Sequence, residues 1–146
     1  MTVDDTVFGE MSYDVALWLK TEEIRMWGKD FETKIEVRAY DNAEISEVQR
    51  NSYLYLKSNI QTISEYTASL ICDYVNENFE DLSLYWDKPK VYKSFNDFGD
   101  DIRLTAILFE EDGSIIFLCE VAWDVENGLG IKLNRVMDIG PQELFL

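Results

Sequence analysis

Carboxylates are the residues of this sequence whose number and spacing offer the most chemistry. The chain contains 29 aspartates and glutamates but no histidine, and its two cysteines, Cys72 and Cys119, stand alone. Without histidine, neither a Ser-His-Asp nor a Cys-His nucleophile system can be assembled, and the commonest zinc ligand is missing. The glycines are not spaced as in a phosphate-binding loop. We therefore expect a protein that is not an enzyme and that holds no cofactor or metal.

Carboxylate-based catalysis is the alternative to that expectation. Glycoside hydrolysis needs only two carboxylates, and Asp97, Asp100 and Asp101 are close enough in the sequence to bind one divalent cation. With so many acids in the chain, some such group is expected by chance. A solvated acidic loop is the simpler interpretation, so a carboxylate- or metal-dependent hydrolase ranks behind a binding protein.

The formal net charge of −16 is the strongest compositional signal. A field of this sign repels nucleic acid and anionic membranes, and it speeds encounter with a basic protein. The competing explanation is that the charge serves solubility alone. We expect a basic protein as the partner, and neither nucleic acid nor a membrane.

Aromatic residues beside acids indicate where such a partner would bind. Tyrosine and tryptophan are enriched at interface hot spots, and carboxylates pair with the arginines and lysines of a partner. Two stretches, 79–101 and 123–130, combine both types. The predicted partner-binding residues are Trp86, Asp97, Asp100, Asp101, Trp123, Asp124 and Glu126. The alternative is that the aromatics are packing residues and that Trp123–Gly130 is only a structural hairpin.

The first third of the chain, which would support these stretches, shows the alternation of β-strands. Three strands are predicted between Phe8 and Tyr40, around Val15–Lys20, Ile24–Trp27 and Phe31–Ala39. Residues 1–6 are expected to be disordered.

Two helices are predicted in the middle of the chain, near 47–57 and 59–78. Ser46 and Gln49 fit a capping box at the start of the first helix, and Ser58 and Gln61 fit a second one. Residues 79–101 read as an irregular acidic loop.

Further strands are predicted at 102–108, 115–121 and 131–139. Asn127-Gly128 is a strong hairpin signal because both residues tolerate positive φ, so Trp123–Gly130 should be the turn end of an antiparallel pair. The whole order predicts one α+β domain over residues 1–146. Its antiparallel sheet has an N-terminal three-strand meander and C-terminal hairpins, and two central helices cover one face.

The N-terminus is acidic and unlike a signal peptide, and no stretch is long and apolar enough to span a bilayer. Isolated cysteines suit a reducing compartment. These features predict a cytoplasmic protein.

Three stretches, Phe8–Met11, Ile45–Gln49 and Trp123–Gly130, resemble a family of small bacterial proteins of unassigned function. Its members look like immunity proteins of polymorphic-toxin and contact-dependent-inhibition systems. The resemblance spans most of the chain and implies an α+β domain, and it supplies no catalytic residues. It also implies one-to-one binding of a cognate basic toxin domain, with a nuclease as the expected class. An acidic adaptor for another cellular protein is the alternative function.

Overall fold

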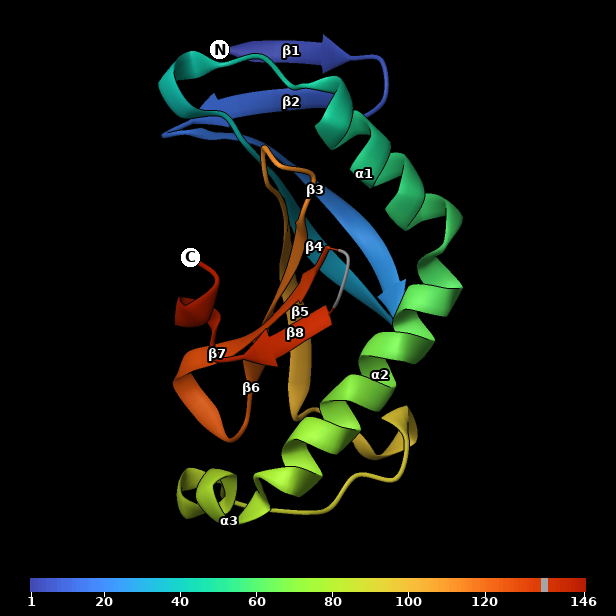
Figure 1. Ribbon diagram of the computed structural model, residues 1–146, viewed down its shortest axis with the longest axis vertical. Helices are drawn as coiled ribbons and strands as arrows, with labels where there is room; N and C mark the ends of the chain where they lie inside the picture. Colours follow the sequence, from blue (N-terminus) through green and yellow to red (C-terminus); the bar gives the residue numbers. More distant parts are fainter. Residues whose placement is uncertain (135–136) are drawn as a thin grey trace.

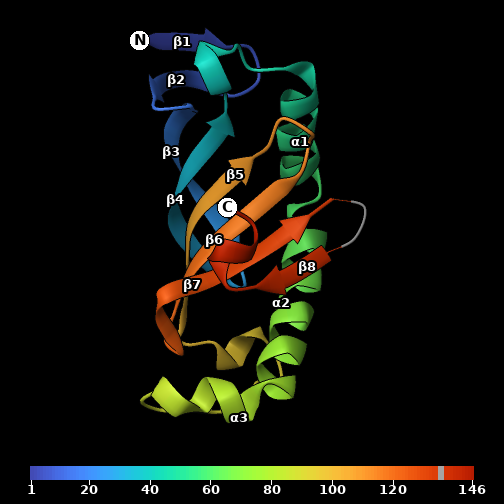
Figure 2. The same ribbon diagram turned by 60° about the vertical axis from the view of Figure 1, so that its left-hand side comes forward.

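Eight strands cross a single sheet in the same order as they occur in the sequence (Figure 1). The computed structural model describes residues 1–134 and 137–146. The strands are β1 (Thr2–Asp5), β2 (Gly9–Asp14), β3 (Leu17–Met26), β4 (Lys29–Arg38), β5 (Ile102–Phe109), β6 (Ile115–Val121), β7 (Asp124–Leu133) and β8 (Met137–Gly140). Two long helices, α1 (Glu47–Ser58) and α2 (Ile60–Glu77), lie along one face of this sheet (Figures 1 and 2). The predicted α+β class is confirmed.

One pair of strands departs from the predicted antiparallel sheet. β4 and β5 are parallel, with Ile35 opposite Ile107 and Val37 opposite Phe109. The chain leaves β4 at one end of the sheet, and α1 and α2 carry it to the other end, where β5 starts in the same direction. A parallel pair requires such a crossover connection. The two predicted helices are therefore also the reason why the sheet is mixed.

Helix α1 begins where its capping box predicts. The Ser46 side chain accepts a hydrogen bond from the amide of Gln49, and the Gln49 side chain accepts one from the amide of Ser46. Gln49 is buried and also donates to the carbonyl oxygens of Arg38 and Phe109, which are the ends of the parallel strands. The second predicted capping box is wrong, because Asn59 precedes α2 and makes no side-chain cap.

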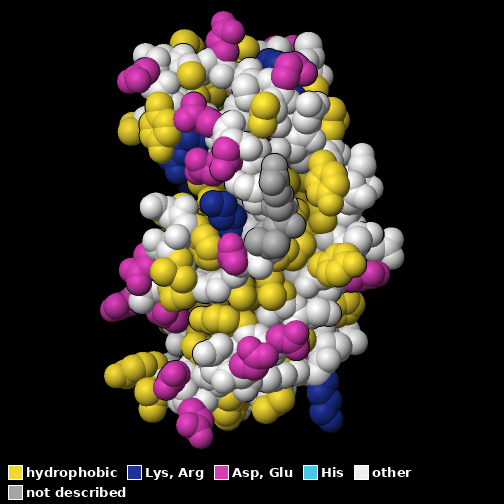
Figure 3. All heavy atoms as spheres, viewed as in Figure 1, with side chains coloured by type: hydrophobic (Ala, Val, Ile, Leu, Met, Phe, Trp, Pro, Cys, Tyr) yellow, Lys and Arg dark blue, Asp and Glu magenta, His cyan; other side chains and the backbone are white. Residues whose placement is uncertain are grey.

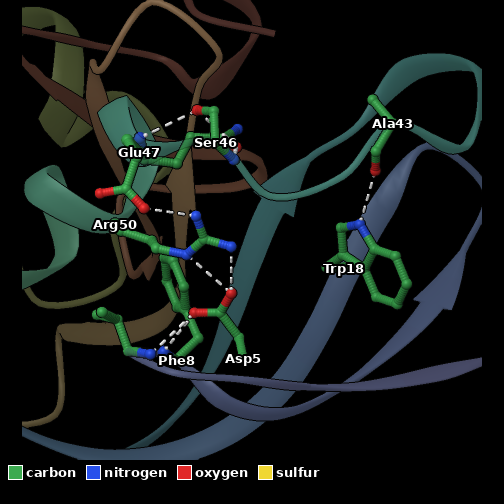
Figure 4. Close-up of polar contacts among 9 residues, drawn as sticks. Asp5, Phe8, Trp18, Ala43, Ser46, Glu47 and Arg50 are labelled. Atoms are coloured by element: carbon green, nitrogen blue, oxygen red, sulfur yellow. Dashed lines mark hydrogen bonds and ion pairs between the residues drawn. The ribbon is translucent and has the colours of Figure 1, made fainter.

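Residues 2–5 form β1, although residues 1–6 were expected to be disordered. Asp5 ends β1, and its carboxylate accepts hydrogen bonds from the amides of Val7 and Phe8. The same carboxylate forms an ion pair with Arg50 of α1, with 2.7 Å between Oδ1 and Nη2 (Figure 4). Burial opposes the ionisation of Asp5, but the hydrogen bonds from Arg50 and the two amides outweigh it and lower its pKa. Glu47 binds the same guanidinium, also at 2.7 Å. A contact across 45 residues thus holds the first strand.

Three strands follow Phe8, but they are not the three that were predicted, because β2 was missed and two predicted strands belong to β3. Val15 and Ala16, predicted to start a strand, form the turn between β2 and β3 with φ of 38° and 65°. Residues 17–26, predicted as parts of two strands, are the single strand β3. Strand alternation alone does not locate a turn made by two residues with side chains.

The two faces of the sheet carry cores of different size. Under the helices, the strands contribute Ile35, Ile107 and Phe117 to one large apolar core, which Leu56 and Ile71 enter from α1 and α2. The opposite face holds a smaller cluster around β5 and β6, and Phe145 near the C-terminus covers part of it. Over residues 1–134 and 137–146, no helix is both long and apolar enough to cross a membrane.

Candidate protein-binding site

The hairpin between β6 and β7 forms the first part of the site, and its turn is not where the sequence predicts it. Val121 pairs with Asp124, so residues 122–123 make the turn. Asn127-Gly128 lies inside β7 instead, and the prediction of a turn there is wrong. Asp124 accepts hydrogen bonds from the amide and the side-chain nitrogen of Asn127 at 3.1 and 3.2 Å.

Gly128 serves a bulge rather than a turn. Four residues of β7, 125–128, stand opposite Glu120 before regular pairing resumes. Gly128 has φ of +63°, and a Cβ there would lie 2.6 Å from the Cys119 carbonyl oxygen. The extra residues project outward, so Val125 is 85% exposed and Glu126 is exposed. The Asn-Gly signal is correct only in the positive φ of Gly128, because Asn127 does not share it and the pair does not make the turn.

Residues 79–101 form the second part, and they are more ordered than predicted. α3 (Phe79–Leu82) continues into the 3₁₀ turn η2 (Ser83–Tyr85), and a second 3₁₀ turn, η3 (Phe95–Asp97), follows. Aromatic side chains beneath these turns pack on one another. Trp86 lies 5.3 Å from Trp123 and 5.8 Å from Tyr92 between ring centroids.

Burial changes the role of the two predicted tryptophans. Trp86 and Trp123 are each 4% exposed, so their assignment as exposed partner contacts is wrong for the free chain. They build the rigid floor of this end of the molecule. The packing interpretation, left open from the sequence, describes them correctly.

Asp97 and Asp101 bind within the chain. Asp97 accepts hydrogen bonds from the amides of Lys93 and Ser94 at 2.7 and 3.2 Å, and these bonds lower its pKa. Asp101 accepts one from Tyr92 at 2.9 Å and lies 3.6 Å from the ammonium of Lys90. Both carboxylates therefore have structural roles.

Asp100 differs, because its side chain is fully exposed and lies 3.7 Å from the Lys29 ammonium. Among the described residues, no group of three or more aspartates, glutamates or cysteines is arranged to hold a metal ion. Asp97, Asp100 and Asp101 do not form such a group.

A hollow of about 570 Å³ separates α3 and η2 from the β6–β7 hairpin. Asp81 and Tyr85 line it on one side, and Asp124 and Glu126 line it on the other. The predicted residues Trp123, Asp124 and Glu126 are thereby brought together. Asp100 and Asp101 line a neighbouring hollow, which they share with the ion pair of Arg103 and Glu120.

Three more exposed carboxylates belong to the segments beside this hollow: Glu77 at the end of α2, Glu80 in α3 and Asp87 after Trp86. We define the acidic pole as Glu77, Glu80, Asp81, Asp87, Asp124 and Glu126. Figure 3 shows acidic side chains beside apolar ones at this end of the molecule. None of these carboxylates makes an ion pair with a described lysine or arginine. The sequence explains this, because residues 58–87 contain no basic residue and Lys88 is the first to follow.

One charge of the pole, that of Glu77, lies where its helix disfavours an acid. Asp73 and Glu77 are one helical turn apart on α2 and lie in its last turns, where the helix dipole is negative. Burial, and then the charge of Asp124, raises the pKa of Tyr74 on the same helix. Carboxylates at this helix end lower the free energy of unfolding, and a cation bound there would offset that loss.

Apolar side chains are exposed among these acids. Leu84 is 72% exposed, Tyr85 is 88% exposed and Val125 is 85% exposed. A protein interface typically combines apolar side chains that anchor the partner with polar or charged groups around them. Exposed apolar residues among carboxylates fit this pattern, because the carboxylates can bind cationic groups of a partner. Burial raises the pKa of Cys119 to about 12 and also raises that of Cys72, which disfavours the thiolate form of both.

Sequence reasoning missed most of this site, because Asp124 and Glu126 were the only residues of the acidic pole that it predicted. Asp81, Leu84, Tyr85 and Val125 were not predicted, although residues 58–87 without a single base offered a signal. The interpretation of residues 79–101 as irregular concealed α3 and η2. Only their fold reveals that Asp81 and Tyr85 face the β6–β7 hairpin.

This chain matches a known protein family over most of its length. No curated protein and no solved structure matches it. A family described as Domain of unknown function (DUF6985) matches residues 7–146. That range includes every strand except β1, all three helices and the whole acidic pole. The chain therefore belongs to the family described as Domain of unknown function (DUF6985).

Proposed function

We propose that the protein is an immunity protein, which binds a basic toxin domain one-to-one through the acidic pole and blocks it. The observation that carries the proposal is the acidic pole itself. Its carboxylates have no described cationic partner, and three of them, Asp81, Asp124 and Glu126, line one hollow together with exposed Tyr85 and Val125. The resemblance to immunity proteins gives this binding activity its biological setting.

A nuclease is the class of toxin that this surface fits best. A nuclease presents cationic groups to the phosphates of its substrate. A compact group of carboxylates is attracted to the same cations and accelerates association. Exposed apolar side chains then slow dissociation by burying area. We place the protein in the cytoplasm, where the free thiols of Cys72 and Cys119 stay reduced.

The first test is capture of the partner with the tagged full-length protein at low salt, followed by identification by mass. The proposal predicts a basic domain that salt releases and that stops growth when it is expressed alone. Co-expression of this protein should restore growth. A captured basic protein without toxicity would replace the immunity function by that of an acidic adaptor. Capture of neutral or acidic proteins alone would overturn both.

Two variants with equal changes of charge give this test its control. The pole variant carries Glu77→Gln, Asp81→Asn, Asp87→Asn and Glu126→Gln. The N-terminal variant carries Asp4→Asn, Glu10→Gln, Asp14→Asn and Glu44→Gln, which replace exposed acids at the other end of the molecule. The N-terminal variant should restore growth as the wild type does, and the pole variant should not. Equal rescue by both would contradict a role for the pole.

A further inference from the structure

A groove along the outward side of α1 and α2 is a second surface that the fold leaves unfilled. It consists of two hollows of about 350 and 440 Å³, which share Tyr55 and Leu133. The helices form one wall, and the ends of β7 and β8 form the other, with Leu133 and Met137 half-buried. Figure 3 shows apolar side chains on this side of the molecule, over the helices that Figure 1 labels α1 and α2.

The helices carry a second apolar stripe that the core does not use. Their inward stripe includes Tyr53, Leu56, Ile63, Ile71 and Val75, all of which are buried. The groove side has its own positions at spacings of three, four and seven residues, and it continues from α1 into α2. These residues are Val48, Ser52, Tyr55, Thr62, Tyr66 and Leu70.

Exposure of this second stripe is high for aromatic side chains. Tyr55 is 52% exposed and Tyr66 is 65% exposed, while Val48 is 49% exposed. Neither tyrosine hydroxyl makes a hydrogen bond to a described side chain or backbone group. Tyrosines with an exposed ring and a free hydroxyl are the side chains that anchor protein interfaces.

The charge along the groove selects the chemistry of its occupant. Asp73 is the charged residue among the described lining residues, and exposed Glu65 flanks Tyr66. α2 contains Glu65, Asp73 and Glu77 and no lysine or arginine. A second copy of this chain would bring the same negative helix face and its own charge of −16. The charge on the α2 side of the groove therefore favours a cationic occupant over a second copy of this chain.

We propose that this groove binds an amphipathic, cationic α-helix. Its apolar face packs between Tyr55, Tyr66 and Leu133, and its lysines or arginines lie beside Asp73 and Glu65. A helix is the element that fits, because the ridges of α1 and α2 recur at helical spacing along the groove, and ridges of one helix pack into the grooves of another. The inference rests on the proposed function only in that the partner is a basic protein. The contacting surface is different.

The probe is an 18-residue helical peptide of leucine and lysine, with the leucines on one face. A second peptide of the same composition, with the leucines spread around the helix, is its control. Binding is measured by titration calorimetry and located by the backbone amide shifts of the full chain. We expect the amphipathic probe to bind more tightly than the control peptide and to shift the amides of α1, α2, Leu133 and Met137.

A groove variant with Tyr55→Gln and Tyr66→Gln keeps good helix formers and removes the aromatic anchors. We expect it to bind the amphipathic probe about tenfold more weakly or worse. A matched variant with Tyr40→Gln and Leu54→Gln loses two exposed apolar side chains outside the groove and should bind as the wild type does. Unchanged affinity of the groove variant, or amide shifts confined to the acidic pole, would overturn the helix site. Neither result would touch the growth rescue that tests the pole.

Discussion

At the N-terminal end of the molecule, Asp5 and Glu47 share the guanidinium of Arg50, whereas at the acidic pole Glu77 and Asp81 face no described cation. The first arrangement ties a strand to a helix and buries one carboxylate. The second leaves carboxylates exposed and in mutual repulsion. Carboxylates thus raise the free energy of unfolding at one end of the molecule and lower it at the other. The difference separates acids that build the fold from acids that are free to bind a partner.

The largest effect should come from removing the cation of the paired end. Arg50→Met keeps much of the apolar stem but leaves the Asp5 carboxylate, whose side chain is 3% exposed, without its charge partner. An unpaired buried charge is strongly unfavourable, so we expect a loss of about 3 kcal/mol in the free energy of unfolding. Urea denaturation measures it. The double variant Asp5→Asn, Arg50→Met should recover part of the loss, and no recovery would contradict the coupling.

Gly128→Ala tests whether the acidic pole depends on the β7 bulge. A Cβ at this position meets the Cys119 carbonyl oxygen and the Gln142 side chain, each at 2.6 Å, and φ is +63°. We expect a loss of about 2 kcal/mol in unfolding free energy. Gly9→Ala is the matched control, because Gly9 has φ of +82° but no atom within 4 Å of the added Cβ. If both variants lose equal stability, the clash has no part in the effect.

The pH dependence of stability should reveal the paired end. The pKa of Asp5 is lowered from its ordinary value of 3.8 in the folded chain. Its contribution is therefore complete above pH 3.8 and is lost as the pH falls through the lower, folded-state value. Asp5→Asn should cost about 1–2 kcal/mol at neutral pH, and the gap to the wild type should close in stronger acid. A gap that stays constant down to pH 2 would show that ionisation of Asp5 is irrelevant.

A single type of substitution should have opposite signs at the two ends. Glu47 lies in the first turn of α1 and Glu77 in the last turn of α2. At low salt, Glu47→Gln should lower the free energy of unfolding by about 0.5 kcal/mol, and Glu77→Gln should raise it by a similar amount. Thermal unfolding of the two variants in parallel measures both. Added salt should shrink both shifts, and shifts of the same sign would refute the contrast.

Local signals in the sequence predicted local structure at some positions and failed at others, such as Asn127-Gly128 and the second capping box. Ser46 and Gln49 located the start of α1, because a capping box needs only four consecutive residues. The parallel pair of β4 and β5 depended on how α1 and α2 cross the sheet, which strand alternation does not encode. β1 depended on Arg50, 45 residues away from Asp5.

The site was predictable to the extent that its residues lie on one hairpin. Asp124 and Glu126 were found because Asn127-Gly128 marks a local change of backbone direction. Trp86 and Trp123 are buried, although the sequence suggested exposed contacts. A tryptophan next to acids in the sequence does not indicate whether its side chain packs beneath the surface or projects from it. Asp81 and Tyr85 required the tertiary contact of η2 and α3 with β7.

One measurement decides whether the acidic pole binds the partner. It is the association rate of the captured basic domain with the pole variant and with the N-terminal variant, measured across a range of ionic strength. The pole variant should associate about tenfold more slowly or worse at low salt and should depend less on salt, because steering by its charges is lost. The N-terminal variant, with the same net charge, should stay close to the wild type. Equal rates and equal salt dependence for the two variants would show that only the total charge acts and that the pole is not the binding site.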